Sequence, residues 1–116
     1  MNGFDSVLIK EQEERAPGKW AFKLSIPSSS PYFKGHFPDF HLLPAVATVD
    51  IVTLLASGLL GKSVFITSIS RTKFTSPLLP EEEAVFTLDL SRAGVISFKV
   101  DASGHECAKG FLRYSE

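Results

Sequence analysis

A carboxylate inside a long apolar run is the first group in this chain that could do chemistry. Asp50 follows Val46-Ala-Thr-Val and precedes Ile51-Val-Thr-Leu-Leu55, so aliphatic residues surround it in the sequence. Burying an unpaired carboxylate costs several kcal/mol or more, so such an acid is paired, hydrogen-bonded or held protonated. Two interpretations stay open: Asp50 is an acid in an apolar site that exchanges protons, or an acid at the edge of a helix that faces Ser, Arg or backbone.

Histidine supplies the complementary group, because its ordinary pKa lies near neutrality and makes it a suitable general base. His36 lies among aromatic residues in the segment 31–38 and follows a glycine that allows backbone or substrate to approach closely. His41 competes for the same role, whereas His105 follows a turn in a polar stretch and is expected at the surface. A histidine among aromatics can equally be a packed or capping residue.

The element that positions Asp50 is a predicted helix from Ala45 to Leu60. Pro44 suits the first helical position and Gly61 suits the position after the end. The run is apolar on nearly all its faces, so we expect the helix to be enclosed. It has more apolar surface than one small sheet can cover, which predicts a symmetric dimer with the helix and an edge strand near the two-fold axis.

The N-terminus of this helix lacks a side-chain cap. Leu42 and Leu43 carry no side-chain oxygen, so the amides of residues 45–47 have no obvious local partner. Free amides at the positive end of a helix suit a developing oxyanion or a polarised carbonyl. Water or a neighbouring loop could satisfy them instead.

Alternating apolar patterns predict strands on both sides of the helix. The expected strands are 6–13, 20–26, 64–74, 84–90, 95–100 and 105–114. Turn signals separate them, among them Ala16-Pro-Gly-Lys19 and Asp101-Ala-Ser-Gly104. Two strands, a helix and an antiparallel meander predict an α+β fold in a single domain, residues 1–116, whose sheet wraps the helix.

The composition narrows the class of protein. A formal net charge of −1 argues against nucleic acid as the main partner, and the single cysteine, Cys107, excludes an intrachain disulfide or a zinc cluster of thiolates. The N-terminal segment has no signal-peptide pattern, and the apolar run 42–60 carries an acid, so we expect a cytoplasmic protein without a membrane span. Ten phenylalanines suggest either a filled core or an apolar ligand channel.

Three motifs together resemble the 3-hydroxyacyl-(acyl carrier protein) dehydratases. Gly35-His-Phe-Pro38 is followed by Leu43-Pro-Ala-Val46 and by Asp50, with the histidine and the acid fourteen residues apart as in that family. The segment Lys73–Pro80 also resembles the family's Lys-Phe-x-x-Pro-x-x-Pro pattern. The resemblance covers about Tyr32 to Glu82.

The resemblance implies a hot-dog fold, in which a curved antiparallel sheet wraps a long helix, and a homodimer with two active sites at its interface. His36 of one subunit would remove the C2 proton of the thioester, and Asp50 of the other would protonate the departing 3-hydroxyl. Phe37, Pro44, Ala45 and Val46 would contact the substrate, a helix-start amide holding the thioester oxygen. No metal or other cofactor is implied.

The chain departs from the family pattern at several positions near the pair. Ala45 replaces a glycine, Asp39 replaces another, and Phe40-His41 replaces a polar residue and a proline. Asp39 would tend to raise the pKa of His36. Pro80-Glu-Glu replaces Pro-Gly-Asp, and an aspartate at the acid position resembles the dehydratase-isomerase branch and the small dehydratases of polyene-type pathways.

The leading hypothesis is therefore dehydration of a 3-hydroxyacyl thioester to the trans-2-enoyl thioester. The alternatives are a hot-dog thioesterase and a non-catalytic hot-dog subunit that binds acyl chains. The carrier is either acyl carrier protein or coenzyme A. Lys34, Lys62, Arg71 and Lys73 could form a basic rim for an acidic carrier, or simply a solvated face.

Overall fold

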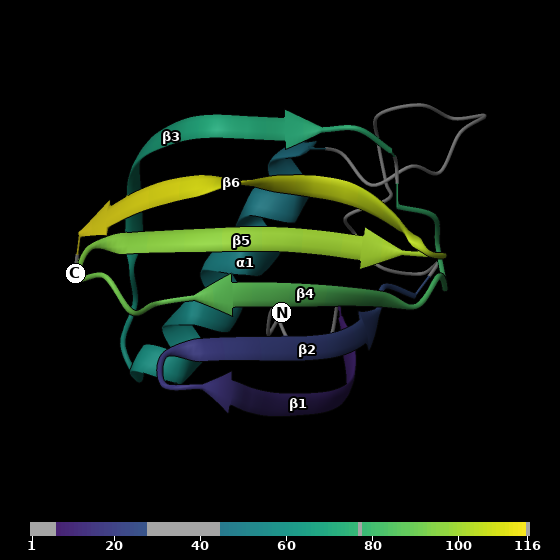
Figure 1. Ribbon diagram of the computed structural model, residues 1–116, viewed down its shortest axis with the longest axis horizontal. Helices are drawn as coiled ribbons and strands as arrows, with labels where there is room; N and C mark the ends of the chain where they lie inside the picture. Colours follow the sequence, from purple (N-terminus) through teal and green to yellow (C-terminus); the bar gives the residue numbers. More distant parts are fainter. Residues whose placement is uncertain (1–6, 28–44, 77, 116) are drawn as a thin grey trace.

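The computed structural model describes residues 7–27, 45–76 and 78–115, which form one antiparallel sheet with a helix on one of its faces (Figure 1). The elements in chain order are β1 (Leu8–Ala16), β2 (Lys19–Ser25), α1 (Ala45–Leu60), β3 (Phe65–Phe74), β4 (Ala84–Asp89), β5 (Val95–Ala102) and β6 (His105–Ser115). The order across the sheet is β1-β2-β4-β5-β6-β3, so β1 and β3 form its edges. The predicted α+β fold class is confirmed.

Tight hairpins set the register of the sheet. Gly18 turns the chain between β1 and β2 with φ 76°, where a side chain would be strained, and a Cβ there would lie 3.2 Å from the Ser91 backbone. The turn between β5 and β6 is shorter than expected, because Ala102 pairs with His105 and leaves only two residues at the corner. Both corner residues have positive φ, as a two-residue hairpin requires, so β5 runs on to Ala102 instead of ending at Val100.

The core lies between the sheet and α1. Alternate residues of β2 point to the helix, as the sequence predicts: Phe22, Leu24 and Ile26 are buried and Trp20 is partly buried. The other fully buried side chains from the sheet are Phe86, Leu88, Ile96, Val100 and Leu112. Each such side chain contributes about 1.5–3 kcal/mol relative to leaving it in water.

The described residues of one chain do not enclose the helix, so its enclosure with the help of a partner stays a prediction. Its residues Ile51, Val52, Leu55 and Ala56 pack against the sheet and are buried. On its other side Val49, Leu54, Leu59 and Leu60 are only half-buried. A sheet of six strands covers one face of a helix, and the remaining apolar surface stays open to solvent or to a partner.

The phenylalanines divide between core and surface. Phe22, Phe86 and Phe98 are buried, whereas Phe65, Phe74 and Phe111 are exposed. The three exposed rings lie on β3 and β6, at one edge of the sheet. Within the part of the chain that the structure describes, no helix has both the length and the apolar character needed to cross a bilayer.

Candidate active site

The structure fixes one part of the predicted site. His36, Phe37 and Pro44 lie outside the described residues, as do Asp39 and His41. The parts that are placed are the helix that carries Asp50, its first residues Ala45 and Val46, and the neighbouring edge strand β3. The meeting of His36 with Asp50 therefore stays a prediction.

The helix start agrees with the sequence. α1 begins at Ala45, and its first turn holds no acidic residue that would neutralise the positive end. Asp50 lies five residues further on, which places it about 7.5 Å along the helix axis at 1.5 Å per residue. Asp50 therefore lies less than two turns from the amide end of the helix.

Asp50 is exposed in the single chain, although Ile51 and Val52 beside it are completely buried. The helix turns residue 50 away from the sheet because its packed face is made by positions 47, 51, 52, 55 and 56. Within the described part of one protomer, apolar side chains therefore do not bury Asp50. The exposure of Asp50 agrees with the other interpretation, an acid at the edge of the helix.

The edge strand β3 carries an apolar strip on the helix side of the sheet. Ile69 pairs with Leu112 and Phe74 pairs with Ala108, and directly paired residues share a face of the sheet. Leu112 and Ala108 are buried beneath the helix, yet Ile69 is 53% and Phe74 is 44% exposed. Together with the half-buried Ile66 they form a helix-side strip at the sheet edge, and the described residues leave it uncovered.

The segment that follows β3 is fixed by Glu82, one of the departures from the family pattern. Its carboxylate accepts a hydrogen bond from the Leu79 backbone N–H at 3.1 Å and another from the Ser103 hydroxyl at 2.6 Å. Leu78 is buried in the core. The apolar side chain of Leu78 and the carboxylate of Glu82 therefore both hold this connection in place. The glutamate thus takes a structural role, tying the connection to the β5–β6 turn.

Two other reactive side chains, Cys107 and His105, are poorly suited to take part in the chemistry. Burial raises the pKa of the Cys107 thiol, and nearby Glu82 and Asp101 act in the same direction. A buried, protonated thiol is a poor nucleophile. His105 is exposed, with Nδ1 3.3 Å from the Ser103 carbonyl oxygen, which confirms the expected surface position.

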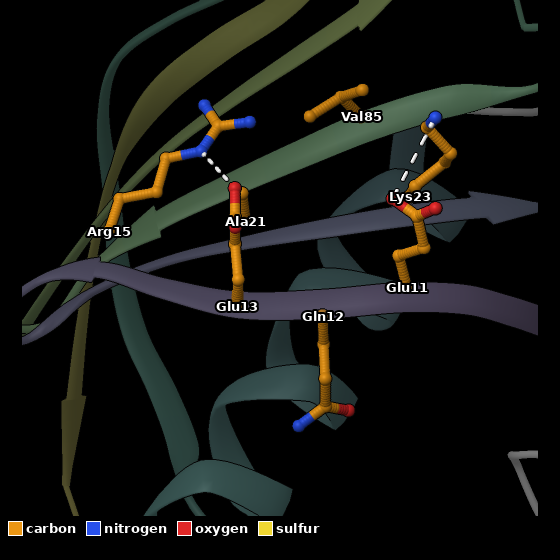
Figure 2. A pocket seen from close by; sticks show the side chains of 7 residues that line it. All are labelled: Glu11, Gln12, Glu13, Arg15, Ala21, Lys23 and Val85. Atoms are coloured by element: carbon orange, nitrogen blue, oxygen red, sulfur yellow. Dashed lines mark hydrogen bonds and ion pairs between the residues drawn. The ribbon is translucent and has the colours of Figure 1, made fainter.

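The outer face of the sheet, opposite the helix, carries a charged pocket at the β1 edge. Figure 2 shows Glu11 and Glu13 pointing to this face and Gln12 pointing to the helix side. The pocket, of about 280 Å³, is neutralised from within, because Arg15 contacts Glu13 at 3.0 Å and Lys23 contacts Glu11 at 3.8 Å. Charges that satisfy each other leave little to bind a ligand.

Sequence reasoning missed two groups that the structure places at the β3 edge. The first is the apolar strip of Ile69 and Phe74, and the second is a set of arginines on the outer face that includes Arg92 and Arg113. The absence of acids from the strand sequence Phe65-Ile-Thr-Ser-Ile-Ser-Arg-Thr-Lys-Phe74 was a signal for the first. The second depends on strand register, which the sequence alone does not specify.

A family model described as ApeI-like, ApeI dehydratase, matches residues 10–111. The chain belongs to the ApeI-like dehydratase family. A solved structure of the dehydratase heterocomplex ApeI:P from Xenorhabdus doucetiae superimposes with a TM-score of 0.83 at 25% identity, covering 94% of this chain and 97% of that one.

Other relatives agree with the ApeI-like assignment. One curated relative, from Polynucleobacter asymbioticus, is named 3-hydroxyacyl-[acyl-carrier-protein] dehydratase FabZ. It is 28% identical to this chain over 68% of the chain, and the match covers 59% of the relative's own length. Thioesterase superfamily member 2 of Mus musculus has a TM-score of 0.67 at 19% identity, covering 98% of this chain and 88% of that one, and shows the fold alone. The predicted dehydratase family and hot-dog fold are confirmed.

Proposed function

We propose that this ApeI-like protein dehydrates a 3-hydroxyacyl thioester to the trans-2-enoyl thioester in fatty-acid or polyene-type biosynthesis. One observation carries the proposal: Asp50, fourteen residues after the motif histidine, is exposed on α1 next to the buried Ile51. The exposure of Asp50 supports the proposal, because an exposed carboxyl on the helix is accessible to a substrate.

The proposed reaction is an elimination that needs one base and one acid. Neutral His36 takes the proton from C2, the C2–C3 double bond forms as the C3–O bond breaks, and Asp50 supplies the proton with which the hydroxyl leaves as water. Backbone N–H groups at the start of α1 would stabilise the negative charge that develops on the thioester oxygen. The proton gained by His36 and the proton lost by Asp50 are then exchanged through solvent to regenerate the pair.

We propose that a second copy completes the site. The open side of α1 and the helix-side strip of Ile69 and Phe74 lie where a two-fold partner would cover both. The partner would bring its His36 to Asp50 and exclude water from the pair.

The substrate would be carried on acyl carrier protein or coenzyme A in the cytoplasm, and Phe37, Pro44, Ala45 and Val46 would contact it. The names of the FabZ relatives support a protein-borne substrate. The ApeI:P heterocomplex raises a non-identical subunit as the alternative to a homodimer. Both points are tested by the oligomeric state and by the carrier that supports turnover.

The competing function is thioester hydrolysis, which several proteins with this fold are named for. It would need an acid that activates water and has no use for His36. A steady-state assay that follows enoyl-thioester absorbance and free-thiol release on the same 3-hydroxyacyl substrate separates the two. The proposal expects absorbance to rise without thiol release; thiol release alone, or neither signal, would contradict it.

A further inference from the structure

A second pocket opens on the outer face of the sheet at the β3 edge, and it is unlike the charged pocket of Figure 2. Its volume is about 330 Å³, and Ser70, Arg71, Arg92, Val95, Phe111 and Arg113 line it. Three of the six are arginines, and none is acidic. All are exposed except Val95, which is half-buried, so the pocket is a shallow basic surface around an exposed aromatic ring.

Strand register brings these residues together. Exposed and buried residues alternate along β6. Phe111 and Arg113 are exposed on the outer face, whereas Gly110 and Leu112 are buried on the helix side. Across the ladder, Arg113 pairs with Val95 of β5 and Phe111 pairs with Ser70 of β3. Paired residues share a face, so neighbouring strands add their side chains around the same ring.

The third arginine is brought in by a β-bulge. Ser70 pairs with Phe111 and Lys73 pairs with Lys109, so Arg71 and Thr72 together oppose Gly110. Arg71 has φ 48°, in the left-handed region that a non-glycine residue occupies at a cost. A Cβ at position 110 would collide with the Thr72 side chain and lie 2.9 Å from its Cα, so glycine there is what lets the bulge form.

The three guanidinium groups have no acidic partner among the described residues. The other arginine, Arg15, lies 3.0 Å from Glu13, and Lys10, Lys23, Lys99 and Lys109 also have carboxylates within 4.0 Å. None of these ion pairs involves Arg71, Arg92 or Arg113. A strained bulge that aims one arginine at two others concentrates like charge, which favours an external anion.

We propose that Arg71, Arg92, Arg113 and Phe111 form the docking surface for the acidic face of the carrier protein that delivers the acyl group. The inference rests on the proposed dehydratase function and names its carrier. Small ligands prefer pockets that enclose most of their surface, whereas protein interfaces are shallow and enriched in arginine and aromatic residues. Successive β3 residues, Ile69 and Ser70, face the apolar strip and this surface respectively, so a carrier docked here sits at the same sheet edge as the strip.

The test compares one 3-hydroxyacyl chain on three carriers: holo acyl carrier protein, coenzyme A and uncharged N-acetylcysteamine. Arg71→Glu/Arg92→Glu/Arg113→Glu should lower kcat/KM for the carrier-protein substrate about 100-fold, and the loss should shrink as salt is added. The same variant should stay within about two-fold of wild type on N-acetylcysteamine, because the chemistry is untouched. Arg15→Glu, the same substitution in the pocket of Figure 2, is the matched control and should leave all three rates unchanged.

Each other outcome overturns a different statement. Loss confined to the coenzyme A substrate would assign the arginines to its phosphates, and equal loss on all three substrates would assign them to the fold. Unchanged kcat/KM on the carrier protein would remove the docking surface. A wild-type protein inactive on all three substrates would contradict the dehydratase function itself. In that case, titration of the carrier protein against the wild type and the triple variant tests docking separately. Equal affinities of the two proteins for the carrier would refute the docking surface.

Discussion

The two edge strands of the sheet carry opposite kinds of surface. β1 is covered with charge: its Lys10 contacts Glu83 at 3.3 Å, and its glutamates contact Arg15 and Lys23. β3 has no acidic residue, and its apolar residues Phe65, Ile69 and Phe74 are 64%, 53% and 44% exposed. Charged side chains keep a sheet edge in solvent, whereas exposed apolar side chains favour contact with another chain. The difference supports the proposal that β1 is a solvent edge and that a partner covers β3.

The largest effect is expected at the helix beside β3. Asp50→Asn keeps the size of the side chain and removes the proton it donates, so turnover should fall by roughly 10²–10⁴-fold. Thermal stability should stay level or rise, since the dimer would no longer bury an acid. A turnover assay and a melting curve on the one variant decide the matter. Glu14→Gln, the corresponding loss of a carboxylate on β1, is the control, and a lower melting temperature with turnover retained would show that Asp50 is structural.

The next effect concerns assembly. Ile69→Lys places a charge in the proposed interface and should weaken dimerisation on the order of 100-fold, as burial of an unpaired cation demands. Leu8→Lys is a close match, because Leu8 on β1 is 52% exposed and Ile69 is 53% exposed. Sedimentation over a range of concentrations should show monomer for the first and dimer for the second. Equal behaviour of the two variants would remove the distinction between the edges.

A third effect compares close packing at the β3 bulge with backbone strain at the end of α1. Gly110→Ala pushes a methyl group into Thr72 and should destabilise the fold by about 1–3 kcal/mol. Gly61→Ala meets no atom within 4 Å and tests only the cost of φ 71°, about 1 kcal/mol. Urea unfolding of both measures the difference. A Gly110→Ala midpoint equal to that of wild type would mean that the bulge yields freely.

The smallest effect is a pH dependence of the stability at the end of β4, in the half of the sheet that contains β1. The hydroxyl and backbone N–H of Ser91 donate to Asp89 at 2.6 Å and 2.9 Å, and these bonds hold the pKa of that carboxyl below its usual value. A lowered pKa contributes stability above the ordinary pKa, about 4, that is lost as pH falls through the folded value. Ser91→Ala should therefore cost about 0.5 kcal/mol at pH 7 and almost nothing at pH 2. A loss of equal size at both pH values would contradict this.

The elements could be predicted from the sequence because local patterns specify them. The helix bounds Ala45–Leu60 and the apolar face of β2 follow from periodicity and from Pro44 and Gly61. The exposure of Asp50 could not be predicted, because an all-apolar helix does not reveal which of its faces one sheet will cover. The arginine surface was equally hidden, since it depends on a bulge opposite Gly110 that shifts the register by one residue.

The central claim is that the β3 edge joins two copies so that His36 of one reaches Asp50 of the other. Subunit exchange between His36→Ala and Asp50→Asn, each inactive alone, tests it most directly. Half of the randomly mixed dimers contain one intact pair out of two, so activity should return to about a quarter of the wild-type value. A mixture that exchanges subunits, stays dimeric and remains inactive would contradict a site shared between subunits.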